Sequence, residues 1–99
     1  MLNISKKMEN NVLTISLEGR LDTPSAIQFE ESLMESIGEA EELVLDFEKL
    51  DYIASSGLRV LFVAQEKMSE KGGMKIIHVP DIVMEVFEVT NFVDVLTIE

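Results

Sequence analysis

The chain has no cysteine and no tryptophan, and only one histidine and two prolines among its 99 residues. Without cysteine it can form neither a disulfide framework nor a thiolate site, which fits a reducing compartment. With a single histidine, the other common metal ligands would have to be carboxylates. The glutamate pairs at 30–31 and 41–42 have the pattern of solvated helix and loop faces. We therefore predict no metal site and no bound cofactor.

Basic residues are also scarce. The sequence has eight lysines and arginines but 19 aspartates and glutamates, which gives a net charge of −11. Such a field repels nucleic acid and anionic lipid surfaces, so neither is an expected partner. A basic protein surface is the more plausible partner. The alternative interpretation is that the acidic surface only keeps a small protein soluble.

No apolar run reaches the length of a membrane span, because Arg59, Asp81 and Glu85 interrupt the best candidates. The start of the chain, residues 1–7, carries its lysines after its few apolar residues, and no apolar segment follows as it would in a signal peptide. At 46% apolar residues the chain can bury a core of its own. We expect a soluble cytoplasmic protein with a single domain over residues 1–99.

Hydrophobic patterns predict a hairpin and then a helix in the first third. Residues 1–7 can form a strand, and residues 12–17 alternate apolar and small polar side chains as a half-buried strand does, with a turn at 10–11 and an end at Gly19. Thr23, as a cap residue before a proline, predicts a helix start. The helix would bury a stripe at spacings of three and four, and end at Gly38. The stripe is Ala26, Phe29, Leu33 and Ile37.

The remaining patterns alternate strands with helices. A short apolar strand at 43–47 precedes a helix from Ser56 to Lys71 that is apolar on nearly every side in its first half. A strand at 74–79 follows, then a short helix opened by Pro80-Asp81, a left-handed residue at Asn91, and a last strand or extended tail at 93–98. The stripe expected to be buried in the short helix is Ile82, Val83, Val86 and Phe87. The order predicts an α/β fold with a mixed sheet that is antiparallel in its opening hairpin and parallel afterwards.

The motif Ala54-Ser55-Ser56-Gly57 lies where the central strand is expected to turn into its helix. Backbone N–H groups and the positive end of the helix dipole make that position favourable for a phosphate. Capping is the structural alternative, because serine is a favoured N-cap, but one serine suffices for it. Gly57 costs about 1 kcal/mol against alanine in a helix, which suggests that another backbone or a partner approaches closely. Both interpretations remain open at this point.

Catalytic alternatives to a phosphate switch are weak. Gly72-Gly73 follows a helix rather than a strand, so it does not predict a nucleotide-binding loop. A serine hydrolase would need Ser55 or Ser56 together with His78, oriented by a carboxylate such as Asp46, and the glycine that precedes the nucleophile in a hydrolase elbow is missing. We therefore do not expect an enzyme.

Four segments in the same order resemble the STAS domain of bacterial anti-sigma factor antagonists. Residues 17–22 are similar to the glycine-then-aspartate segment after the second strand, and residues 43–47 to the central strand. Residues 53–58 resemble the phosphorylation loop, which is the most specific part of the match. Residues 90–92 stand where the family often has threonine, glycine and leucine. The resemblance implies a STAS fold over nearly the whole chain.

The resemblance also implies a mechanism. The unphosphorylated antagonist binds an anti-sigma factor that is also a serine kinase, and so releases a sigma factor. The kinase, with its own ATP and Mg²⁺, then phosphorylates a loop serine, the complex dissociates, and a separate phosphatase resets the cycle. By position the acceptor is Ser55, with Ser56 as second choice. The protein itself would be a monomer or weak dimer. The expected partner-binding residues are Asp22, Thr23, Asp51, Ala54, Ser56, Gly57, Leu58 and Arg59, although Leu58 is equally suited to the core.

One position departs from the family pattern. Many members carry aspartate directly before the acceptor serine, whereas this chain has Ala54. A kinase can supply its own base, so phosphorylation remains compatible with alanine. The departure keeps open a second function, an unmodified STAS scaffold in a signalling or lipid-transport complex.

Overall fold

The computed structural model describes residues 2–99, so the first residue of the predicted opening strand lies outside the described part. The elements are β1 (Leu2–Glu9), β2 (Val12–Leu21), α1 (Thr23–Ser36), β3 (Glu42–Ile53), α2 (Ser55–Met68), β4 (Met74–Ile77) and α3 (Asp81–Val89). Single 3₁₀ turns follow α1 at Ile37–Glu39 and α3 at Phe92–Asp94.

The four strands form one sheet in the order β1-β2-β3-β4. β1 runs antiparallel to β2, while β2, β3 and β4 are parallel, as predicted. A two-residue turn joins the hairpin, in which Glu9 pairs with Val12. Asn10 and Asn11 both have positive φ, at 52° and 67°, which asparagine tolerates better than most residues.

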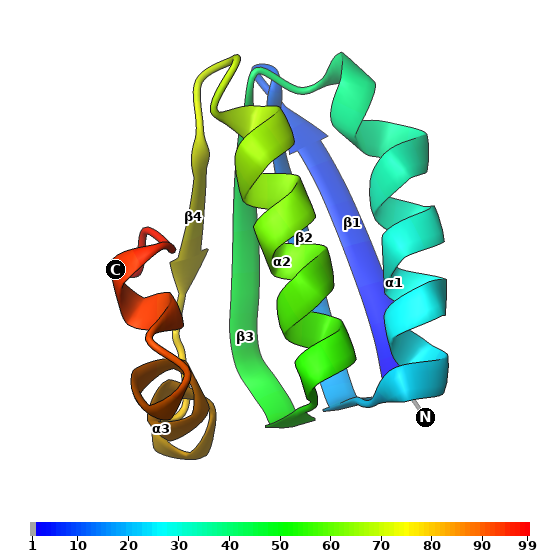
Figure 1. The fold of residues 1–99 in the computed structure, drawn as a ribbon. Coiled ribbons are helices and arrows are strands. Elements are labelled where there is room, and N and C mark those ends of the chain that lie inside the picture. The colour runs from blue at the N-terminus through cyan, green and yellow to red at the C-terminus, as the bar shows by residue number, and fades with distance from the viewer. Residues whose placement is uncertain (1) are drawn as a thin grey trace.

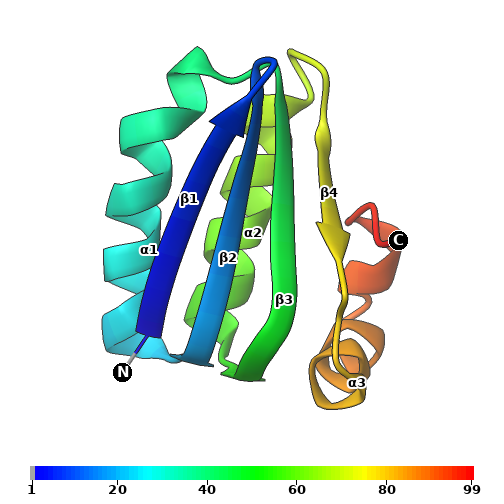
Figure 2. The same ribbon diagram turned by 180° about the vertical axis from the view of Figure 1, so that it is seen from behind.

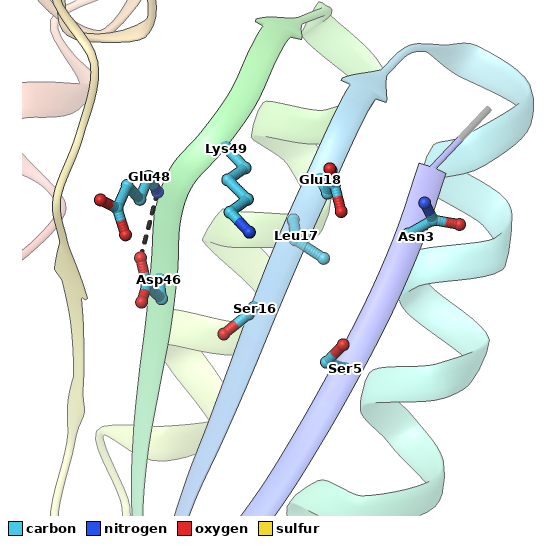
Figure 3. Close-up of a pocket in the computed structure, with 8 residues that line it drawn as sticks. All are labelled: Asn3, Ser5, Ser16, Leu17, Glu18, Asp46, Glu48 and Lys49. Carbon is cyan, nitrogen blue, oxygen red and sulfur yellow. Dashed lines mark hydrogen bonds between the residues drawn. The ribbon is translucent and has the colours of Figure 1, made fainter.

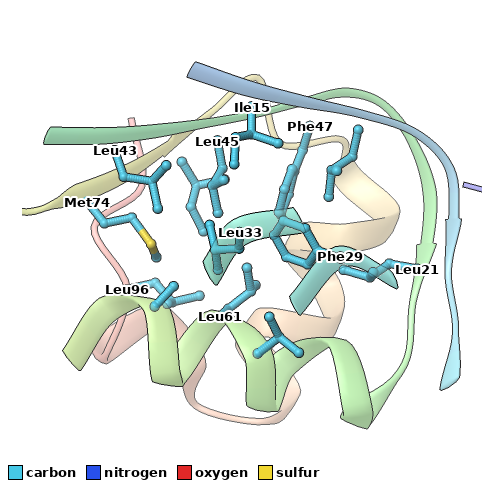
Figure 4. Packing of buried hydrophobic residues seen from close by; sticks show 14 of the residues in the cluster. Ile15, Leu21, Phe29, Leu33, Leu43, Leu45, Phe47, Leu61, Met74 and Leu96 are labelled. Atoms are coloured by element: carbon cyan, nitrogen blue, oxygen red, sulfur yellow. The ribbon is translucent and has the colours of Figure 1, made fainter. Parts of the chain in front are cut away.

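Helices α1 and α2 cover one face of the sheet, whereas α3 lies beyond the end of β4, on the β4 side of the molecule (Figure 1). The view from behind shows the opposite face of β1, β2 and β3, which these helices leave open (Figure 2). The covered face holds the core, where Ile15, Leu45 and Phe47 of the sheet meet Phe29 of α1 and Leu61 of α2 (Figure 4). The predicted stripe of α1 is buried in full, including Ile37 in the 3₁₀ turn.

Lysine 71 connects the far ends of the two helices. Its Nζ atom donates to the carbonyl oxygens of Ile37, Gly38 and Ala40 at 2.9–3.0 Å. These carbonyls end the α1 segment and would otherwise need water or another donor. The chain just after α2 is therefore tied to the chain just after α1.

Three strands extend further than predicted: β1 by two residues, to Glu9, and β2 and β3 by more. β2 continues through Gly19, whose φ of 112° suits glycine, to Leu21. β3 runs on to Ile53, and its register against β2 shifts twice. Each shift places one extra β3 residue opposite β2, as a β-bulge does. As a result Phe47, Leu50 and Ile53 all face the core at a spacing of three rather than two.

Four other predictions were wrong in detail. α2 ends at Met68, before the predicted Lys71. β4 ends at Ile77, and His78 follows it with a φ of 57° rather than lying in the strand. Ile82 is 58% exposed instead of buried. The expected strand at 93–98 is a 3₁₀ turn and a single bridge from Ile98 to Ile76, whereas the left-handed residue at Asn91 is confirmed, with a φ of 64°.

Candidate functional site

The serine corner, defined here as residues 54–57, lies where β3 ends and α2 begins. The adjacent parallel strand β2 ends at the same edge and leads into α1, so both helices start side by side (Figure 1). The N–H of Ala54 donates to the carbonyl of Leu21 at 2.9 Å, which joins the two strand ends. The positive ends of two helix dipoles therefore lie at one edge of the sheet.

Neither serine caps the helix. The N-cap is Ala54, which has no side-chain acceptor, and its carbonyl accepts the N–H groups of Gly57 and Leu58 at 3.0 and 3.1 Å. Ser55 and Ser56 are the first two helical residues, where backbone N–H groups precede the first intrahelical bond. The capping explanation for the serine pair is therefore wrong.

The two hydroxyls lie in different surroundings. Ser55 is exposed, whereas Ser56 is half-buried and faces α1. The Ser56 hydroxyl donates to Thr23 Oγ1 at 3.2 Å, so it connects the first turns of α2 and α1. Ser55 therefore presents its hydroxyl at the surface while Ser56 has an internal partner.

Gly57 and Leu58 belong to the packing beneath the corner. A Cβ atom at Gly57 would lie 2.8 Å from Leu21 Cγ and 3.0 Å from Ile53 Cγ1. A close approach at Gly57 is therefore present, but it comes from side chains of β2 and β3 and not from the backbone or partner that the sequence suggested. Leu58 is only 4% exposed, so the core interpretation of this residue is correct and the expectation of direct partner contact is not supported for it.

Asp22 caps α1 and holds Thr23 in place. Its carboxylate accepts the N–H of Ser25 at 3.2 Å and lies 2.7 Å from the Ser25 hydroxyl, which in turn accepts the N–H of Asp22. These two hydrogen bonds to the carboxylate, the hydroxyl first, lower the pKa of Asp22 from its usual 3.8. The prediction of Thr23 as the cap was therefore wrong, and the role of Ser25 was missed, although Asp-x-x-Ser is close to the capping-box pattern.

The remaining predicted contact residues lie on the surface around the corner. Arg59, one turn further along α2, forms an ion pair with Glu30 of α1 at 2.9 Å. Asp51 is exposed on β3. Beside it the Arg20 guanidinium stacks over the Tyr52 ring at 4.2 Å from the centroid. Glu30, Arg20 and Tyr52 were missed, because a cross-element pairing leaves no pattern in the local sequence.

Within the described residues 2–99, one group of side chains has donors close enough to hold a metal ion. Single ligand atoms of Asp46, Glu48 and His78 lie within 4.8 Å of one another. Asp46 Oδ1 already accepts the Glu48 N–H at 3.0 Å and lies 3.1 Å from His78 Nδ1. Its bond to Glu48 satisfies an N–H that the first β-bulge removes from the sheet ladder.

The position of Asp46 and His78 also tests the alternative that the protein is a serine hydrolase. His78 does pair with Asp46, as a triad would require. Ile53, the last residue of β3, lies seven positions after Asp46, however, which is roughly 20 Å along an extended strand. His78 is therefore far from Ser55 and Ser56, and these residues form no catalytic triad.

A hollow of about 220 Å³ lies on the open face of the sheet at the first bulge (Figure 3). Its lining is mostly polar and comes from β1, β2 and β3. The Lys49 side chain points toward β2, whereas the Glu48 carboxylate lies on the β4 side. The lining residues are Asn3, Ser5, Ser16, Leu17, Glu18, Asp46, Glu48 and Lys49. The hollow is on a different part of the sheet from the serine corner.

A model of the STAS domain family matches residues 3–99. The chain belongs to the STAS domain family. Among curated relatives of this STAS domain, the Bordetella bronchiseptica protein BtrV, named as an anti-sigma factor antagonist, is 33% identical over 91 residues, which cover 90% of this chain and 78% of BtrV. The anti-sigma-B factor antagonist of Bacillus subtilis is 26% identical over 99 residues and is covered to 90%.

Solved structures confirm the fold of the STAS domain. An anti-sigma factor antagonist from Mycobacterium paratuberculosis superposes with a TM-score of 0.90 at 17% identity, covering 99% of this chain and 85% of that one. The unphosphorylated form of the antagonist SpoIIAA gives a TM-score of 0.83 at 18% identity, covering 98% and 88%. The phosphorylated form of the Bacillus SpoIIAA gives 0.76, again at 18% identity, covering 98% and 91%.

No helix in residues 2–99 of the STAS domain is both long enough and apolar enough to cross a membrane.

Proposed function

We propose that this STAS domain is an anti-sigma factor antagonist that is switched by phosphorylation of Ser55. The observation that carries the proposal is the exposed Ser55 hydroxyl at the first helical position of α2, where it has no capping role. The names of two curated relatives and the existence of phosphorylated and unphosphorylated forms of SpoIIAA support it. The protein would act by binding rather than by catalysis, as a single domain in the cytoplasm, where sigma factors act.

In this proposal the unphosphorylated protein binds a kinase-type anti-sigma factor through the surface around the serine corner. Thr23, Asp51 and Arg59, at the start of α1, near the end of β3 and in the second turn of α2, are exposed as Ser55 is. Phosphorylation adds about −1.5 to −2 charges and a bulky group at Ser55, which weakens binding because the phosphate disturbs the fit of the two surfaces and must lose water to be buried between them. A phosphatase that acts on the phosphoserine restores the binding state.

The fold itself should tolerate the phosphate. A negative group at a helix N-terminus is favoured by the dipole and by nearby backbone N–H groups, typically by about 0.3–1 kcal/mol. Phosphorylation would therefore change what the protein binds and leave its architecture intact.

The proposal is tested with purified kinase-type anti-sigma factors encoded in the genome of origin, incubated one at a time with ATP, Mg²⁺ and the wild-type, Ser55→Ala or Ser56→Ala protein. We expect mass spectrometry to find phosphate mainly on Ser55 of the wild type, only slow uptake by Ser55→Ala, and retention of the Ser55 phosphate in Ser56→Ala. Phosphate taken up equally by wild type and Ser55→Ala would contradict the assignment. A Ser55→Asp variant with wild-type thermal stability and reduced affinity for the same anti-sigma factor would support the switch.

A second candidate function is a scaffold that binds its partner without modification. Ala54 favours it, because no carboxylate stands directly before Ser55 to assist a kinase or phosphatase. Partner affinity that is the same for wild type, Ser55→Asp and Ser55→Ala would favour the scaffold over the switch.

A further inference from the structure

We propose that Thr23 determines which of the two adjacent serines accepts the phosphate. Its hydroxyl engages Ser56 and so leaves Ser55 as the acceptor. Thr23 is then a positioning residue that acts through Ser56, and the inference rests on the proposed phosphorylation switch.

Ser55 and Ser56 have chemically identical side chains, but the helix places them in different surroundings. Consecutive residues of an α-helix project about 100° apart, and here Ser55 faces solvent while Ser56 faces α1. The Ser56 hydroxyl donates a hydrogen bond to Thr23 Oγ1 at 3.2 Å. Among the described residues, this is the side-chain contact by which the Ser56 hydroxyl differs from that of Ser55.

Thr23 is held firmly enough to act in this way. It is the first residue of α1, directly after Asp22, whose reciprocal hydrogen bonds with Ser25 fix the start of that helix. A threonine side chain in a helix divides mainly between two χ1 rotamers, and in this structure its hydroxyl lies 3.2 Å from Ser56 Oγ. The Arg59–Glu30 ion pair links the same two helices one turn beyond the corner.

The chemistry of phosphoryl transfer explains why this contact matters. The serine oxygen forms a bond to the γ-phosphorus of ATP, the bond from that phosphorus to the ADP oxygen breaks, and the serine proton passes to a base of the kinase. Ser56 must first give up its bond to Thr23 and turn away from α1. The net value of one neutral hydrogen bond corresponds to a factor of about five in reactivity.

The test isolates Ser56 by removing the favoured acceptor. In the Ser55→Ala protein, the initial rate of Ser56 phosphorylation by the kinase-type anti-sigma factor should rise about fivefold when Thr23→Val is added, because valine keeps the shape and removes the hydroxyl. Thr23→Ser should return the rate to that of Ser55→Ala alone. Thr97→Val, in the C-terminal segment beside β4, is the matched control and should change nothing.

The protein with both serines gives an independent measurement. In Thr23→Val the ratio of phosphate on Ser55 to phosphate on Ser56, read by peptide fragmentation, should fall about fivefold while the thermal midpoint stays within a few degrees of wild type. An unchanged ratio together with an unchanged Ser56 rate would overturn the inference. Wild-type protein that accepts no phosphate from any of the kinases would overturn the proposed function and this inference with it. Phosphate on Ser55 of the wild type and of Thr23→Val, with none on Ser56 in any variant, would overturn only the inference.

Discussion

Glycine 57 shows how one residue sets the geometry of the serine corner. Its Cα lies so close to β2 and β3 that an added methyl group would overlap Leu21 Cγ and Leu21 Cδ2, at 2.8 and 2.9 Å. Because Leu21 is fully buried, it has little room to move away. The position of α2, and with it the exposure of Ser55, depends on the absence of a side chain here.

We predict that Gly57→Ala destabilises the protein by about 1–3 kcal/mol, although alanine favours helix formation, because overpacking of the core outweighs that preference. Gly38→Ala is the matched control, since a Cβ there meets nothing within 4 Å, and it should be neutral or stabilising by up to about 1 kcal/mol. Urea unfolding of both variants measures the difference. Equal stabilities of the two variants would show that the α2–sheet contact can relax.

Aspartate 22 gives the fold a measurable response to acid. Because its pKa is lowered in the folded state, its ionised form contributes stability in full above the unfolded pKa. That contribution is lost as the pH falls through the lower, folded pKa. We expect wild type to be more stable than Asp22→Asn at pH 7, and the difference to shrink progressively as the pH falls below about 4.

Asparagine is the useful replacement, because it caps a helix about as well as aspartate and does not titrate. Urea unfolding at several pH values, performed on both proteins, measures the difference directly. A stability difference that stays constant down to pH 3 would mean that the hydrogen bonds to Ser25 do not depend on the charge of Asp22.

At the scale of elements, the order of the strands and helices from β1 to α3 could be predicted from the sequence. The spacing of apolar residues changes between a strand and a helix, and turn-forming residues stand near these boundaries. The asparagine pair and the α1 stripe are such signals. β3 was predicted too short for a physical reason: its two bulges place Phe47, Leu50 and Ile53 on one face at intervals of three, which breaks the alternation by which a strand is recognised.

The candidate site could be located from the sequence, but its internal contacts could not. A serine pair after an apolar strand marks the corner, and the family resemblance singles out Ser55. The bond between Ser56 and Thr23 joins residues 33 positions apart, and the cap at Ala54 uses a residue with no capping preference. Both depend on how α1 and α2 lie against each other, which a local pattern does not contain.

At the scale of the whole molecule, the net charge of −11 is the dominant electrostatic feature. The ion pairs on the surface involve partly exposed side chains, such as Lys7 with Glu9 and Lys75 with Glu99, and pairs of this kind contribute little. Repulsion among the excess carboxylates therefore opposes the compact state.

We predict that the thermal midpoint rises when NaCl is increased from about 10 to 150 mM, because the Debye length falls to about 8 Å and screens this repulsion. Calorimetry measures the shift, and a repeat with choline chloride separates screening from specific binding of sodium. A midpoint that falls with salt would mean that the surface ion pairs outweigh the repulsion.

Helices α1 and α2, which cover the sheet, are linked by polar contacts at three positions along their length. Lys71 ties the chain beyond their C-terminal ends, Arg59 and Glu30 join them partway along, and Ser56 meets Thr23 where they begin. These links join α1 and α2 near both ends and partway along their length. A phosphate on Ser55 therefore acts first on a partner that contacts this edge of the sheet, and less through a movement of α1 against α2.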